Sequence, residues 1–438
     1  MKDKISIVGA GLVGSLLAVI LKQKGFEVQI FEKRKDPRKS KALEGRSINL
    51  ALSQRGIKSL QLAGVYKNIE PYLIPMTGRM MHSIDGDLTY QPYGKEGQFI
   101  NSVSRAQLNQ LLIESAEAAG VQVFFDHKCK DVDFKENSIV FENGSKIESD
   151  LIIGTDGAFS AIRKKLQVTD RFNFSQHYIE HGYKELCIEP KGGDFRLEPN
   201  YLHIWPRGNF MLIALPNNDK TFTCTLFFPF KGNPSFDSLN SIEAVNNFFK
   251  AYFNDALELI PDLADQFFHN PTSSLVTTKC DPWNNNRSIL LGDAAHAIVP
   301  FYGQGMNSGF EDVRLFIEMA EEMNWDWDKV LPSYSSMRKK DADAISELAL
   351  HNFIEMRDHV GDPSFLKRKK LEAQIQEKFP EDWIPLYSMV TFSDMPYSEA
   401  LRLGKIQKKI MDDVLKEGNP ESKIDQAISQ FNALKKVD

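Results

Sequence analysis

The start of the chain carries the feature that most restricts its fold. An apolar strand over residues 5–8 runs into the turn Gly9-Ala10-Gly11-Leu12-Val13-Gly14, a helix follows over residues 12–24, and a strand over residues 27–31 leads to Glu32. Glycines in such a turn let the backbone approach a pyrophosphate, whose charge the helix N-terminus stabilises. A carboxylate after the second strand can bind ribose hydroxyls. The segment predicts a Rossmann-type unit, and Glu32 favours FAD or NAD over a phosphorylated ribose.

A glycine turn that only packs a helix on a strand would look the same, but two further segments follow apolar strands. Gly154-Thr155-Asp156-Gly157 follows residues 151–153, and Leu291-Gly292-Asp293 ends the run over residues 288–291. Asp293 can accept hydrogen bonds from the hydroxyls of a flavin side chain. The turn Pro300-Phe301-Tyr302-Gly303-Gln304-Gly305-Met306-Asn307 precedes a helix expected over residues 309–323, and N–H groups at that turn would stabilise charge on a reduced flavin. We interpret His296 as a structural, hydrogen-bonded histidine.

The remainder of the chain changes character twice. Residues 170–280 alternate β-branched and aromatic residues with polar ones, which predicts a largely antiparallel sheet, and the chain beyond about residue 331 is helical. The predicted fold class is α/β, with a Rossmann-type FAD-binding domain, an inserted antiparallel-sheet substrate domain and a helical C-terminal region. We assign residues 1–75, 95–168 and 280–330 to the first, 76–94 and 169–279 to the second, and 331–438 to the third.

Composition points to small-molecule chemistry. A net charge of -6 and a pI near 5.9 argue against a nucleic-acid partner. The four cysteines form no C-x-x-C pair, which argues against a zinc site and suits a reducing cytoplasm. No apolar run reaches the ~18 residues of a membrane helix, and the charged residues 405–436 are expected to form a soluble helical cover over the substrate domain. We therefore expect a cytoplasmic protein without a metal or a membrane partner.

The three segments, in this order, resemble those of the flavin-dependent aromatic hydroxylases. The resemblance implies an FAD cofactor, O2 as the oxidant and NADPH as a transient reductant, because no second G-x-G-x-x-G follows a strand. Arg105 matches an R-x-x-L motif that contacts the flavin chain in this family. The residues expected to bind the cofactor are Gly9, Gly11, Val13, Gly14, Phe31, Glu32, Lys33, Arg34, Ala51, Arg105, Cys129, Asp156, Asp293, Gly305, Met306 and Asn307.

Longer strings resemble the members of that family that hydroxylate L-kynurenine at ring position 3, on the route to quinolinate and NAD. They span residues 45–53, 79–83, 198–207, 352–357 and 384–392. The match implies that Arg79 and Tyr93 hold the substrate carboxylate, as a guanidinium and a phenol can. It also implies that Asn352 and Tyr387 complete the polar end. Pro300 and Phe301 would help to enclose the aniline ring.

The implied mechanism transfers oxygen from an adduct at the flavin C4a position to the ring. Because an aniline is already electron-rich, we expect no catalytic residue of the protein that acts as an essential base. Two alternatives stay open: a flavin hydroxylase of another aromatic acid, and a non-catalytic flavin-binding protein. The oligomeric state is not predicted.

Overall fold

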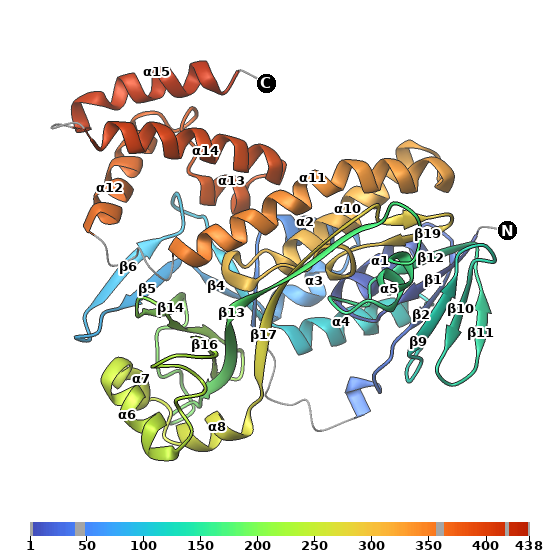
Figure 1. The fold of residues 1–438 in the computed structure, drawn as a ribbon, viewed down its shortest axis with the longest axis horizontal. Helices are drawn as coiled ribbons and strands as arrows, with labels where there is room; N and C mark the ends of the chain where they lie inside the picture. The colour runs from blue at the N-terminus through green and yellow to red at the C-terminus, as the bar shows by residue number, and fades with distance from the viewer. Residues whose placement is uncertain (1–2, 40–48, 356–362, 417–419, 437–438) are drawn as a thin grey trace.

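The computed structural model describes residues 3–39, 49–355, 363–416 and 420–436. Parts of two strings used above, residues 45–48 and 356–357, lie outside these ranges. Figure 1 shows the N-terminal sheet at one end of the molecule and the C-terminal helices, in red, at the other end, above the pair β5–β6. The predicted division into domains is not tested by this arrangement and stays a prediction.

A six-stranded sheet forms the predicted Rossmann core. Its order is β18-β19-β12-β1-β2-β8, and all neighbours are parallel except β18 with β19. The near-continuous apolar strands of the centre are buried on both faces, as parallel sheets require. The strands are β1 (Lys4–Val8), β2 (Glu27–Phe31), β8 (Gln122–Phe124), β12 (Leu151–Gly154), β18 (Asn284–Asn285) and β19 (Ser288–Leu290). The accompanying helices include α1 (Leu12–Gln23), α4 (Arg105–Ala118), α5 (Ala161–Leu166), α9 (Asp293–His296) and α10 (Gly305–Glu322).

A seven-stranded sheet occupies the middle of the chain, in the order β17-β13-β16-β15-β14-β5-β6. Its neighbours are antiparallel, as predicted, except that β14 runs parallel to β5 and so brings the β5–β6 hairpin into the sheet. The strands are β5 (Gly78–His82), β6 (Leu88–Pro92), β13 (Asn173–Ile188), β14 (Tyr201–Pro206), β15 (Met211–Pro216), β16 (Phe222–Pro229) and β17 (Thr272–Asp281). Apolar side chains of α6 (Ile242–Tyr252), α7 (Asn254–Leu257) and α8 (Leu263–His269) share a core with one face of this sheet.

Two three-stranded sheets were not predicted. One has the order β3-β7-β4 and the other β11-β10-β9. Their strands are β3 (Asn49–Leu52), β4 (Ile74–Met76), β7 (Ile100–Ser104), β9 (Cys129–Asp133), β10 (Ser138–Phe141) and β11 (Lys146–Glu148). Short helical segments join them to the rest of the chain. These are η1 (Pro37–Lys39), α2 (Gln54–Leu62), α3 (Tyr66–Ile69), η3 (Glu70–Tyr72) and η4 (Pro300–Tyr302).

The C-terminal region is helical, as predicted, and shares one apolar core with the middle sheet. Phe301 and Met81 contribute to this core together with side chains of the last helices. The helices are α11 (Trp327–Ile354), α12 (Pro363–Lys378), α13 (Leu386–Phe392), α14 (Tyr397–Val414), η6 (Pro420–Lys423) and α15 (Ile424–Leu434). Within the described ranges, no helix combines the length and the apolar character needed to cross a membrane.

Candidate active site

The glycine turn between β1 and α1 contains two kinds of glycine. A Cβ on Gly9 would lie 2.6 Å from the carbonyl oxygen of Thr155, and one on Gly14 would lie 2.1 Å from the carbonyl oxygen of Gly9. These two glycines are therefore required by close packing. A Cβ on Gly11 would meet nothing within 4 Å, and no side chain caps the start of α1. Open space beside free helix N–H groups fits a pyrophosphate.

Glu32 is buried and tied to the same turn. Its Oε2 accepts a hydrogen bond from the Ala10 N–H at 3.0 Å, and its Oε1 accepts from the backbone N–H and the Nε of Arg34 at 2.9 and 3.0 Å. The ring of Phe31 is in the core, stacked on Phe124 at 5.2 Å, whereas Lys33 is exposed. A ligand beside β2 would therefore meet Glu32 and the exposed cations but not the Phe31 ring.

Asp156 presents a buried polar atom without a partner. Its Oδ2 accepts a hydrogen bond from the Ala161 N–H at 2.6 Å, but its Oδ1 is buried and has no partner among the described residues. Loss of hydration raises the pKa of the Asp156 carboxyl, and it also raises the pKa of the nearby Cys129 thiol, to about 12. An orphaned oxygen of this kind is satisfied when a ligand group donates to it. Asp156 thus fits the cofactor contact expected of it.

Asp293 is the first residue of α9, and its side chain is exposed to solvent. Loss of hydration raises the pKa of its carboxyl, and the positive charge of Arg105 opposes that shift. The two predicted cofactor residues are therefore close enough to interact. Arg163, which was not among the predicted site residues, links their neighbourhood to that of Asp156, since its Nη1 donates to the Ala294 carbonyl at 2.7 Å and its Nη2 donates to the Ala158 carbonyl.

The turn before α10 is held by Asn307, whose side chain is fully buried. Its Oδ1 accepts from the Ser53 N–H at 2.9 Å, and its Nδ2 donates to the carbonyls of Ala51 and Gly303 at 2.8 and 2.9 Å. The side chain is thus engaged within the protein. Gly303 has a left-handed φ of 66°, so α10 begins at Gly305, four residues before the predicted start. The free N–H groups of Gly305 and Met306 are then available at the helix N-terminus.

Val13, predicted to bind the cofactor, and His296 both lie near this turn. Val13 fits against glycines, since a Cβ on Gly292 or Gly309 would lie 2.9 or 2.7 Å from its Cγ2. The Nε2 of His296 lies within hydrogen-bond distance of Asp312, at 2.6 Å from its Oδ2, and the ring stacks on Trp283 at 5.1 Å, which supports the structural interpretation of this histidine.

Arg79 lies among aromatic rings on β5. Its guanidinium carbon is 5.5 Å from the ring centre of Tyr93 and 5.0 Å from that of Tyr387. Tyr387 stacks between Tyr93 at 5.4 Å and Tyr302 at 5.6 Å. The Nε of Arg79 and the hydroxyl of Tyr93 are buried without a hydrogen-bond partner, and no carboxylate forms a salt bridge with Arg79 within the described ranges. Burial opposes the charge, but Tyr387, Tyr93 and Glu355 outweigh it, so the pKa of Arg79 is raised.

An aromatic wall adjoins this cluster. The ring of Phe301 stacks on Phe353 at 4.1 Å and contacts Phe227 at 4.8 Å. Asn352 is buried and donates from Nδ2 to the Phe301 carbonyl at 2.6 Å, whereas Pro300 is exposed. The structure therefore brings five of the six predicted substrate residues into one neighbourhood, and Pro300 adjoins it.

Sequence reasoning missed three residues here. Tyr302 and Phe353 stack on predicted residues, and Glu355 lies near Arg79 and forms an ion pair with Lys369 at 3.4 Å. The strings quoted above contained all three, but only tertiary contacts show which members face the site. No group of three or more potential metal ligands occurs in the described part of the chain.

Fold and site together define a flavoprotein, since the family model described as "FAD binding domain" matches residues 2–349. Two curated relatives are both kynurenine 3-monooxygenases. That of Christiangramia forsetii is 48% identical over 96% of this chain and 96% of its own length, and that of Dictyostelium discoideum is 47% identical over 97% and 96%. The chain belongs to the kynurenine 3-monooxygenase family. The solved tetrameric form of 2-methyl-3-hydroxypyridine-5-carboxylic acid oxygenase shares the fold, with a TM-score of 0.69 at 19% identity over 83% of this chain and 95% of that one.

Proposed function

We propose that this chain hydroxylates L-kynurenine at ring position 3, with FAD as cofactor, NADPH as reductant and O2 as co-substrate. The observation that carries the proposal is the half-buried Arg79 side chain between Tyr93 and Tyr387, whose Nε is buried and has no hydrogen-bond partner among the described residues. A buried guanidinium N–H without an acceptor is costly, and a ligand carboxylate would supply that acceptor in a charge-assisted hydrogen bond. Family membership supports the same substrate class.

Both charged groups of an amino acid find a complement at this site. The substrate carboxylate would accept from Arg79 and from the hydroxyl of Tyr93, which has no other partner. Glu355, which lies near Arg79, would accept from the substrate ammonium. A hydroxybenzoate has no ammonium and would leave Glu355 paired only with Lys369, so the site favours an amino acid, which can make both contacts.

The aromatic wall would hold the aniline ring next to the flavin. Phe301 and Phe353 offer a stacked apolar surface, and Phe301 precedes the turn that begins α10. Bound at the glycine turn and at α10, FAD supplies the redox chemistry that activates O2. The protein holds the ring and excludes water.

The tyrosines of the site are hydrogen-bond donors and not bases. Loss of hydration raises the pKa of Tyr93 and that of Tyr302 well above the ordinary value, so both phenols keep their protons at neutral pH. This supports the prediction that no protein base is required.

The proposal is tested by NADPH oxidation and product analysis with the purified yellow holoenzyme. L-Kynurenine should stimulate NADPH oxidation and yield 3-hydroxykynurenine, whereas 4-hydroxybenzoate should do neither. Hydroxylation of the benzoate alone would favour the alternative aromatic-acid hydroxylase. Bound FAD without substrate-stimulated oxidation by either compound would favour a non-catalytic role. The cytoplasmic location stays a prediction.

A further inference from the structure

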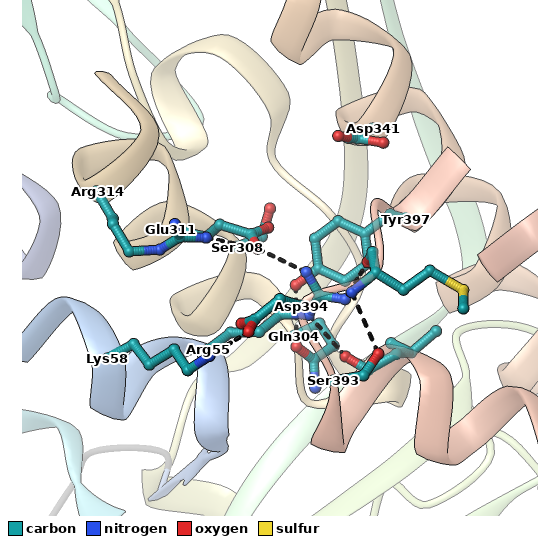
Figure 2. Close-up of polar contacts among 12 residues, drawn as sticks. Arg55, Lys58, Gln304, Ser308, Glu311, Arg314, Asp341, Ser393, Asp394 and Tyr397 are labelled. Atoms are coloured by element: carbon teal, nitrogen blue, oxygen red, sulfur yellow. Dashed lines mark hydrogen bonds and ion pairs between the residues drawn. The ribbon is translucent and has the colours of Figure 1, made fainter. Parts of the chain in front are cut away.

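A buried network of charged side chains lies between the first turns of α10 and the C-terminal helices. Arg55, on α2, is 1% exposed and pairs through Nη1 with Glu311 of α10 at 2.5 Å. Glu311 also pairs with Arg338 of α11 at 2.9 Å. Figure 2 shows Arg55 directed from α2 toward Glu311 on one side and the segment around Ser393 on the other. None of these residues was predicted to be functional.

The other face of the Arg55 guanidinium holds the carbonyl end of α13. Nε donates to the Val390 carbonyl at 2.8 Å, and Nη2 donates to the carbonyls of Met389 and Met395 at 3.4 and 2.5 Å. The last carbonyls of a helix have no partner within that helix, and α13 ends at Phe392, where the Ser393 hydroxyl donates to the Met389 carbonyl at 2.6 Å. Arg55 therefore satisfies the Val390 carbonyl, shares the Met389 carbonyl with Ser393, and ties the segment that follows α13 through Met395.

The near end of α13 carries Tyr387, the ring that stacks between Tyr93 and Tyr302 in the candidate substrate site. Tyr387 precedes Val390 by three residues, which is about 4.5 Å along a helix. A movement of the held carbonyls would thus carry the Tyr387 ring with it.

Helix α2, which carries Arg55, is also hydrogen-bonded to the turn before α10 that is proposed to face the flavin. Ser53, just before α2, donates its N–H to the Asn307 side chain at 2.9 Å. The ring centre of Tyr397, at the start of α14, lies 4.1 Å from the Arg55 guanidinium carbon. The Tyr397 hydroxyl donates to the Oε1 of Gln304, the residue after Gly303, at 3.1 Å. Arg55 and its neighbours therefore bridge α13 and the first turn of α10.

We propose that Arg55 is a positioning residue for the hydroxylation. By holding the carbonyl end of α13 against α2 and α10, it fixes the Tyr387 ring relative to the turn before α10, and so sets how the substrate is presented to the flavin. The inference rests on the function proposed above. A role limited to stability would change unfolding of the protein but not the fate of the oxygen once the holoenzyme has formed.

The test replaces Arg55 with lysine, which keeps the charge beside Glu311 but loses the planar fork that reaches several carbonyls. In the FAD-loaded Arg55→Lys enzyme, the KM for L-kynurenine should rise about tenfold, and the yield of 3-hydroxykynurenine per NADPH oxidised should fall, because small misplacements cost much in such reactions. A holoenzyme with wild-type KM and wild-type yield would overturn the proposal.

Lys58 offers a matched control. It lies one turn further along α2 and pairs with Asp394 on the same C-terminal segment, but both side chains are partly exposed and neither touches the α13 carbonyls. Lys58→Met removes a tie between the same two segments and should leave KM and product yield unchanged. If Lys58→Met matches Arg55→Lys in both, the effect is a general loosening and the proposal is wrong.

A double mutant separates positioning from stability. If Arg55 acts through the Tyr387 ring, then adding Arg55→Lys to Tyr387→Leu, which lacks the ring, should raise the KM by less than half the factor seen in the wild-type background. Full multiplication of the two factors contradicts the proposal. Should Arg55→Lys yield no holoenzyme, Glu311→Gln carries the test, since it removes the carboxylate that pairs with Arg55 and with Arg338 but keeps a side chain of the same size. A lowered product yield supports the proposal, and a wild-type yield overturns it. Absence of product from the wild-type enzyme would instead overturn the proposed function.

Discussion

Replacement of Arg79 by methionine should weaken substrate binding without unfolding the protein. The guanidinium has no carboxylate partner in the described part of the chain, and its Nε is buried and unsatisfied. Removing it relieves the cost of the buried, unsatisfied Nε, which offsets the loss of the contacts that the guanidinium makes with the rings of Tyr93 and Tyr387. The free energy of unfolding should therefore change by no more than about 1 kcal/mol.

Substrate affinity should respond quite differently. Charge-assisted hydrogen bonds contribute about 1.5–3 kcal/mol each, so losing a two-bond contact with the carboxylate should cost about 3 kcal/mol, or about 100-fold in Kd. The assay titrates Arg79→Met and the wild type with L-kynurenine and follows the flavin absorbance. The control ligand is kynurenine without its carboxylate, for which both proteins should bind within about threefold of each other.

Two results would refute this reasoning. If Arg79→Met weakens both ligands equally, the arginine shapes the pocket and does not bind the carboxylate. If the variant loses several kcal/mol of stability while its affinity for L-kynurenine is unchanged, Arg79 is a structural residue paired in a way that the structure does not show.

Two other predictions concern the cofactor and pH. Gly11→Ala should fold normally but bind FAD at least about tenfold less tightly, because the added Cβ enters the open space proposed for the pyrophosphate. Gly14→Ala should fail to fold stably, because its Cβ would overlap the Gly9 carbonyl. Equal FAD retention by Gly11→Ala and the wild type would contradict the proposed pyrophosphate site. Loss of hydration lowers the pKa of buried His203 to about 4. As the pH falls, His203 takes up a proton near pH 6.5 in the unfolded chain but only near pH 4 in the folded protein. The free energy of unfolding is therefore highest above pH 6.5 and falls by about 2 kcal/mol between pH 7 and 5. His203→Gln should remove that part of the loss in urea unfolding, and an unchanged pH profile would contradict the assignment.

The glycine and aspartate segments could be predicted because their constraints are local. A turn such as that at Gly9 needs its residue types wherever the chain leads, and a strand that precedes it is recognisable from a few apolar residues. The start of α10 was predicted four residues late because the segment from Gly303 to Asn307 was assigned to a turn, with the helix beginning at Gly309. Gly309 is in fact a helical glycine, needed where the Val13 side chain packs at close range.

The rest depends on contacts between distant segments. Strands of three to five residues with mixed polarity, such as those of the β3-β7-β4 sheet, carry no clear periodicity. Likewise, nothing local to Tyr302 or Phe353 shows that their rings stack on Tyr387 and Phe301. The role of Arg55 is wholly tertiary, because its partners lie more than 250 residues further along the chain.

The central claim, hydroxylation of kynurenine by the FAD-loaded chain, is tested most directly by isotope labelling. The holoenzyme is supplied with L-kynurenine, NADPH and 18O2, and the product is analysed by mass spectrometry. We predict 3-hydroxykynurenine that contains one 18O atom, with none incorporated when labelled water replaces labelled oxygen. A product without the label from 18O2, or no hydroxylated product from a fully flavin-loaded enzyme, would contradict the account.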